Sequence, residues 1–146
     1  MSKEIERKFL VTDTSYRALA TGKAEIVQGY LSRVPERTVR VRLWNDEAFL
    51  TVKTRNVGIT RNEWEYRIPA ADAREMLKAC EGLLEKTRYI VPAGDGLKWE
   101  VDEFHGRHEG LTVAEIELPA EDCGFTKAGF VGEEVTGDPR YYNSNL

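Results

Sequence analysis

The stretch Glu4-Ile5-Glu6-Arg7-Lys8-Phe9 carries a charged side chain at every second position, beginning with Glu4. Side chains two residues apart lie on one face of a β-strand, so this stretch is expected to form a strand with one charged and one more apolar face. The same alternation returns in later segments, between turns that contain Gly, Pro, Asn and Asp. The pattern therefore predicts a sheet of many short strands whose charged positions share one face.

Acids and bases occur together on this charged face. They are Glu4, Glu6, Lys8, Arg40, Arg42, Lys53, Arg55, Arg61, Glu63, Glu65, Arg67, Lys86, Arg88, Lys98, Glu100, Asp102, Glu115 and Glu117. A single half-buried sheet turns such charges to water, but mixed charges on seven strands indicate a closed barrel with a charged interior. Buried ions are costly unless they are paired or meet a charged ligand. A purely structural network, in which each base pairs with an interior acid, is the alternative.

Turn signals divide the chain into eight expected strands and two helices. The strands are expected over 3–11, 24–33, 37–44, 48–56, 60–68, 84–91, 97–105 and 111–118, mostly in hairpin order. Helices are expected over 14–21 and 70–81, and short helical segments and loops over 120–146. The predicted fold class is α+β, mainly β, in a single domain over 1–146. It is an eight-stranded antiparallel β-barrel, or tunnel, with a charged interior and a few flanking helices, wide enough for one small ligand.

Composition and charge exclude several classes of function. The net charge is −4, and the charged face holds ten bases and eight acids, so the rest of the chain is acidic, at −6. An acidic exterior argues against binding of nucleic acid. No apolar run is long enough to span a membrane, and no signal-peptide segment opens the chain, so a cytoplasmic location is expected. Apolar outward faces that the helices leave uncovered favour a homodimer.

The bases of the expected interior suit a linear polyphosphate. The planar guanidinium group of arginine donates hydrogen bonds to two phosphate oxygens at once, and the ammonium group of lysine supplies a compact positive charge. The candidate substrate-binding bases are Lys8, Arg40, Arg42, Lys53, Arg55, Arg61, Lys86 and Arg88. Tyr30 lies on the same face of its strand as Gln28. It is either a proton carrier near these bases or a residue that only holds position.

Paired carboxylates are the second feature of the expected interior. The pairs are Glu4 with Glu6, Glu63 with Glu65, Glu100 with Asp102, and Glu115 with Glu117. Carboxylate oxygens favour Mg²⁺ or Mn²⁺, which would neutralise the acids and activate a water for attack on phosphorus. Mg²⁺ takes only one or two carboxylates, so others, expected to be Glu65 and Glu100, hold the bases. No Ser-His-Asp or Cys-His arrangement offers a covalent nucleophile.

These motifs resemble those of the CYTH superfamily, the triphosphate tunnel metalloenzymes, and in particular its short bacterial type. The resemblance rests on the ExExK motif at 4–8 and on 28–31, 40–42, 51–54, 61–65, 86–89, 99–102, 114–118 and 132–146. It implies an eight-stranded antiparallel tunnel and a divalent-metal-dependent activity on a small-molecule triphosphate. The implied reaction is hydrolysis of inorganic tripolyphosphate to pyrophosphate and phosphate.

The resemblance also implies roles for individual residues. The metal-binding residues would be Glu4, Glu6, Glu63, Asp102, Glu115 and Glu117. The catalytic residues would be Glu4, Glu6, Lys8, Lys53, Glu115 and Glu117. Three alternatives stay open: a class IV-type adenylate cyclase that uses an aromatic residue such as Trp44 to bind adenine, a nucleoside or thiamine triphosphatase, and a non-catalytic polyphosphate-binding module.

Overall fold

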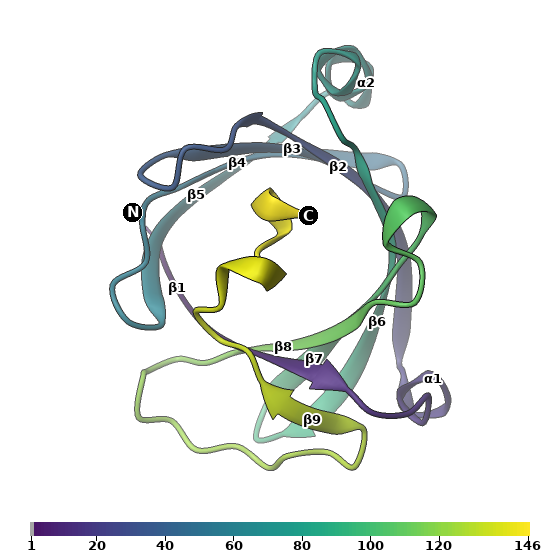
Figure 1. Ribbon diagram of the computed structural model, residues 1–146, viewed down its shortest axis with the longest axis vertical. Coiled ribbons are helices and arrows are strands. Elements are labelled where there is room, and N and C mark those ends of the chain that lie inside the picture. Colours follow the sequence, from purple (N-terminus) through teal and green to yellow (C-terminus); the bar gives the residue numbers. More distant parts are fainter. Residues whose placement is uncertain (1) are drawn as a thin grey trace.

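A computed structural model describes residues 2–146 and shows a closed antiparallel barrel (Figure 1). Its strands are β1 (Ser2–Val11), β2 (Gly22–Ser32), β3 (Thr38–Trp44), β4 (Glu47–Lys53), β5 (Thr60–Ile68), β6 (Leu84–Gly94), β7 (Leu97–Phe104) and β8 (Thr112–Glu117). They pair in the order β5-β4-β3-β2-β6-β7-β8-β1. The first residues of β1 pair with the first residues of β5 and close the barrel. The expected eight-stranded antiparallel barrel is confirmed.

Three elements lie outside the barrel wall (Figure 1). Helix α1 (Tyr16–Leu19) and helix α2 (Ala70–Lys78) are both shorter than the helices expected over 14–21 and 70–81. The ninth strand, β9 (Val131–Glu134), pairs with the end of β1 that extends beyond its pairing with β5. This strand lies where loops and short helices were expected from the sequence, and it corrects that expectation. None of the helices in the described part of the chain is long and apolar enough to cross a membrane.

The two larger apolar cores lie against the outer face of the barrel wall. The larger one joins Phe9 of β1 and Trp99 of β7 to Tyr16 of α1 and to Phe130, which precedes β9. Trp99 and Phe130 meet edge to face, with ring centroids 6.2 Å apart. A second core packs α2 on β3 and β4. Because the apolar side chains of the strands face outward, their alternate, charged positions face the barrel interior.

The end of the chain lies across one opening of the barrel. After β9, two short 3-10 turns, Pro139–Tyr141 and Asn143–Asn145, cross this opening (Figure 1). Lys8 Nζ donates to the carbonyl of Tyr141 at 2.8 Å, and Lys86 Nζ is 3.1 Å from Asn143 Oδ1. Leu146 packs against a small apolar cluster at the same end of the barrel. The segment over 139–146 is therefore held by interior bases and by apolar contact.

Candidate active site

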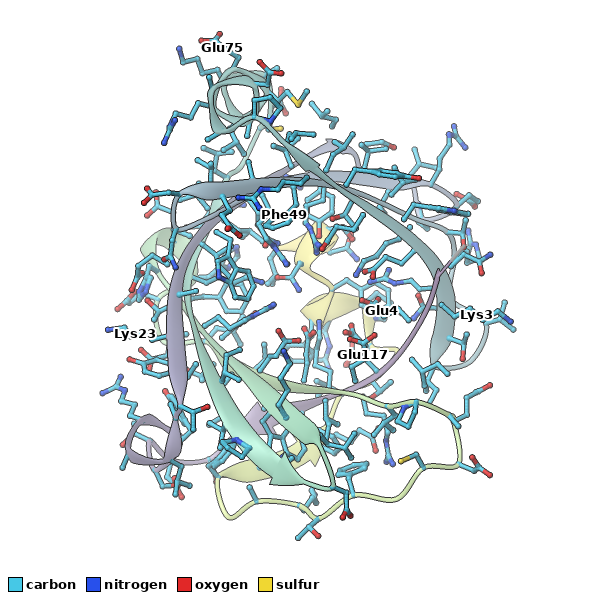
Figure 2. All side chains as sticks on the ribbon, turned by 180° about the vertical axis from the view of Figure 1, so that it is seen from behind. Lys3, Glu4, Lys23, Phe49, Glu75 and Glu117 are labelled. Carbon is cyan, nitrogen blue, oxygen red and sulfur yellow. The ribbon has the colours of Figure 1, made fainter. Side chains whose placement is uncertain are left out.

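A cavity of about 230 Å³ lies inside the barrel, and all eight barrel strands contribute to its wall. Figure 2, which shows the molecule from behind, places the side chains of Glu4 and Glu117 in this interior. The acidic and basic residues of the lining are Glu4, Glu6, Lys8, Arg40, Arg42, Lys53, Arg61, Glu63, Glu65, Arg88, Glu100, Glu115 and Glu117. The alternation along the strands thus brings most of the expected site residues together.

Glu4 is held by two bases. Lys53 Nζ donates to both of its carboxylate oxygens at 2.9 Å, and Arg61 Nε donates to one of them at 3.0 Å. Burial raises the pKa of Glu4, but Lys53 and Arg61 outweigh burial and bring the pKa well below its usual value. Lys53 also lies 3.4 Å from Glu63. Glu4 is therefore ionised in the free protein, and its partners are the bases expected to bind phosphate.

Glu6 and Glu115 are crowded carboxyl groups with one lysine beside them. Lys8 Nζ lies 3.3 Å from Glu115 Oε1. Burial, together with the charges of Glu115 and Glu4, raises the pKa of Glu6 to about 8. Burial also raises the pKa of Glu115, but Lys8 and other bases outweigh it and lower this pKa. Glu6 therefore keeps its proton at neutral pH, while Glu115 is ionised.

Asp102 lies deeper in the wall than these groups and does not line the cavity. It accepts two hydrogen bonds from Arg88, at 2.7 and 2.9 Å, and lies 2.8 Å from Lys86. Burial lowers the pKa of Lys86 to about 7. Bases contact both Asp102 oxygens, and this geometry fits the positioning of Arg88; the metal-binding role expected for Asp102 stays a prediction. Glu100, which was expected to hold a base, lies 3.0 Å from Arg88.

The two arginines of β3 supply positive charge that is weakly neutralised. Arg40 donates to the Thr51 hydroxyl at 3.2 Å and lies 3.6 Å from Glu65, and its Nε has no hydrogen-bond partner among the described residues. Arg42 donates through Nε to Gln28 Oε1 at 3.1 Å. Burial, followed by the neighbouring arginines, lowers the pKa of Arg42 to about 9. This wall therefore attracts an anion.

Some expectations about individual residues are not met. Arg55 is exposed, forms an ion pair with Glu36 and does not line the cavity, because β4 ends at Lys53 and the chain turns away. Lys86 faces inward but is covered by its partners and does not line the cavity either. Tyr30 and Trp44 do line it. Trp44 follows Arg42 by two residues, so the alternation places both on one face.

The C-terminal segment contributes lining residues that the sequence analysis missed. They are Val135, Thr136, Gly137, Tyr142, Asn143 and Ser144. These residues belong to no alternating pattern, because most of them lie in turns after β9 rather than in a strand. The only sequence feature that pointed to this region was the resemblance of residues 132–146 to the short bacterial type. It did not indicate that these residues would line the cavity.

The acidic groups fit a hard divalent cation by their chemistry, although they are not yet arranged around one. Within residues 2–146, no three acidic, histidine or cysteine side chains stand close enough to hold one ion. Several carboxylates are instead bound to bases. Burial and nearby carboxylates raise the pKa of both Glu6 and Glu117, so a cation would relieve a repulsion already present. If Glu4 held a cation, it would have to exchange its basic partners, Lys53 and Arg61, for the ion.

Comparisons with known proteins agree with this geometry. The CYTH domain model matches residues 2–142. An inorganic triphosphatase of Acetivibrio thermocellus is 51% identical over 148 residues, which cover 100% of this chain and 94% of that protein. An inorganic triphosphatase of Nitrosomonas europaea is 37% identical, with 98% of this chain and 95% of that protein covered.

Solved structures show the same fold. A crystal structure of an inorganic triphosphatase has a TM-score of 0.67 and 35% identity, and the match covers 97% of this chain and 95% of that one. A putative adenylyl cyclase from Hippeastrum has a TM-score of 0.64 over 80% of each chain, but at 17% identity it supports the fold alone. The resemblance inferred from the motifs is confirmed, and the chain belongs to the CYTH domain family.

Proposed function

We propose that this chain is a divalent-metal-dependent triphosphatase that hydrolyses inorganic tripolyphosphate to pyrophosphate and phosphate. The observation that carries the proposal is one cavity in which arginines and lysines from five strands face carboxylates from β1, β5, β7 and β8. Phosphoryl transfer depends mainly on positioning and neutralisation of charge, and this interior offers groups for both. Two relatives called inorganic triphosphatases, 51% and 37% identical, support the proposal.

The bases bind and orient the substrate in this proposal. Arg40, Arg42 and Arg88 offer guanidinium groups on neighbouring parts of the wall, and Lys8 and Lys53 offer point charges from β1 and β4. Both lysines contact carboxylates in the free protein, so each one becomes available to phosphate when its carboxylate takes another partner. These bases replace the water that surrounds the triphosphate in solution. They hold a terminal phosphorus within reach of an attacking water.

The proposed cofactor is Mg²⁺ or Mn²⁺, held by Glu4, Glu6, Glu115 and Glu117, with Glu63 as a further acidic position. Such an ion supplies neutralisation of phosphate charge and lowers the pKa of a bound water. Glu6 releases its proton when it takes part in ligation, because only the carboxylate form binds a cation. Asp102 is not part of this proposal, since it lies behind the cavity lining and is 1% exposed.

The test is phosphate release by the purified chain from tripolyphosphate and from ATP, each with Mg²⁺, with Mn²⁺ and with a chelator. Metal-dependent release that strongly favours tripolyphosphate is the expected result. Release from ATP alone would identify a nucleotide-hydrolysing enzyme. Tight binding of tripolyphosphate without turnover would support the non-catalytic binding module instead.

A second candidate, hydrolysis or cyclisation of a nucleoside triphosphate, is favoured by one observation at the cavity edge. A smaller cavity of about 220 Å³ is lined by Arg42, Trp44, Glu47, Phe49 and Glu65. Aromatic rings at such a place stack on nucleobases. Turnover of ATP, or formation of cyclic AMP from it, would select this candidate, whereas turnover of tripolyphosphate alone would reject it.

The state of assembly and the location remain proposals. Val57, Tyr66 and Leu31 are exposed apolar residues, at 80%, 61% and 47%, and we propose that a second copy of the chain covers at least one of them. Light scattering on the purified protein distinguishes a monomer from a dimer. We also propose a cytoplasmic location, and localisation of a tagged chain tests it.

A further inference from the structure

Gln28 is a fully buried polar residue beside the cavity. It lies on β2 and is 0% exposed, and the register places it opposite Arg42 of β3. Its Oε1 accepts a hydrogen bond from Arg42 Nε at 3.1 Å. Because a guanidinium only donates hydrogen bonds, this contact fixes the orientation of the amide. The other amide atom, Nε2, is buried and has no hydrogen-bond partner in the described part of the chain.

The partner of Arg42 differs from the partners of the other interior bases. Each of those bases has a carboxylate oxygen within 4.0 Å, as shown by the pairs Lys8–Glu115, Arg40–Glu65, Lys53–Glu4, Arg61–Glu4, Lys86–Asp102 and Arg88–Asp102. Arg42 has none among residues 2–146, and its described polar partner is the neutral amide of Gln28. Its charge is therefore not cancelled by a neighbouring side chain.

We propose that Gln28 is a positioning residue that acts through Arg42. The amide oxygen aligns the guanidinium through Nε, leaves both terminal nitrogens for phosphate, and does not neutralise the charge. A carboxylate in the same place would make an equally good hydrogen bond but would cancel the charge that attracts the substrate. The inference rests on the proposed triphosphate substrate.

The test is Gln28→Glu, which keeps the size of the side chain and changes only its charge. We expect the KM for tripolyphosphate to rise roughly tenfold or more and kcat to change by less than about threefold. The thermal midpoint should stay the same or rise, because the introduced carboxylate would form an ion pair with Arg42. A residue needed only for packing would give the opposite result, a lower thermal midpoint with an unchanged KM.

Two further variants separate this role from a general effect of added charge. Asn56→Asp puts the same charge elsewhere on the cavity wall, since Asn56 lines the cavity, and should raise KM by less than Gln28→Glu does. In an Arg42→Gln background, Gln28→Glu should change KM by less than about twofold, because the partner through which it acts is gone. An equal effect in both backgrounds would overturn the proposal.

Calorimetric titration with tripolyphosphate distinguishes failure of this inference from failure of the proposed function. If the wild-type chain binds tripolyphosphate but does not hydrolyse it, the proposed reaction fails, and a roughly tenfold weaker Kd in Gln28→Glu still supports the inference. An unchanged Kd and KM in Gln28→Glu overturns the inference whatever the turnover. Absence of both binding and turnover in the wild-type chain would overturn both.

Discussion

Lys53 donates hydrogen bonds to both carboxylate oxygens of Glu4, each at 2.9 Å. A group proposed for a cation and a group proposed for a phosphate thus neutralise each other in the free protein. Buried ion pairs of this kind rarely repay their desolvation in stability. In the proposed function the pair is an exchangeable contact, in which Glu4 would turn to a cation and Lys53 to a phosphate oxygen. Lys8 and Glu115 form a similar contact at 3.3 Å.

Glu117→Ala should lower kcat for tripolyphosphate by about 100-fold or more, while the fold remains intact. Glu117 lines the cavity, and no ion pair is found for it in the described part of the chain. Its removal therefore leaves no buried base without its ion-pair partner. Steady-state phosphate release and a thermal melt provide the measurement. Glu133→Ala, at an exposed position of β9, is the control. A folded Glu117→Ala protein with wild-type rates would contradict the metal assignment, and Glu4→Ala is expected to be equally inactive.

Arg40→Ala should raise the KM for tripolyphosphate by roughly tenfold, which corresponds to about 1.4 kcal/mol of lost binding. Arg40 is buried at the cavity wall, and within residues 2–146 its Nε has no hydrogen-bond partner, so the guanidinium has capacity for a phosphate oxygen. The matched control is Arg55→Ala, which removes an exposed arginine that pairs with Glu36 outside the cavity. Equal KM values in the two variants would argue against a phosphate-binding role for Arg40.

Metal affinity should increase with pH up to about pH 8 and level off above it. Burial and nearby carboxylates raise the pKa of Glu6 to about 8, so Glu6 must lose a proton before it can ligate. Without metal, the unfolded chain loses this proton at lower pH than the folded chain does. The free energy of unfolding should therefore fall as pH rises from about 4.5 to about 8. Thermal shifts with and without Mg²⁺ across this range give both quantities.

Glu6→Gln supplies the control for this pH dependence. The variant has no carboxyl group to titrate at this position, so its metal-free stability should vary less with pH between about 4.5 and 8. An unchanged pH profile in Glu6→Gln would show that another group is responsible.

Phe130→Ala should destabilise the protein by about 3–5 kcal/mol. Phe130 is 0% exposed and packs edge to face against Tyr16 and Trp99, with ring centroids 5.8 and 6.2 Å apart. It connects the segment before β9 to the main apolar core. Urea denaturation measures the loss, and Phe125→Ala, at a partly buried ring of the same cluster, should cost less. A loss below about 1 kcal/mol would contradict the assignment of Phe130 to the core.

The barrel and its charged interior were predictable because strand geometry alone determines which face a side chain occupies. Arg40 and Arg42, or Glu115 and Glu117, must share a face if their segments are strands. The limits of a strand are less certain from sequence. Arg55 continues the alternation of Lys53, but pairing between β4 and β5 ends at Lys53, so Arg55 lies outside.

The alternating pattern does not predict which acid pairs with which base inside the barrel. Spacing places Asp102 and Glu115 on the inner face alike, but only the packed structure shows that bases occupy both oxygens of Asp102. Strand β9 was missed because Val131–Glu134 is short and holds one glycine and two glutamates, which are poor strand formers. Its partner, β1, is distant in sequence, so no local signal records the pairing.

The mutual neutralisation of acids and bases favours binding of metal and polyphosphate together over binding of either one alone. In the proposed function, a cation that arrives alone must take Glu4 from Lys53, which then keeps only the more distant Glu63, and a phosphate that arrives alone takes Lys53 from Glu4, which then keeps only Arg61. When both arrive together, each released group finds its new partner in the same cavity. Metal and polyphosphate should therefore strengthen each other's binding by the same factor, as thermodynamic linkage requires.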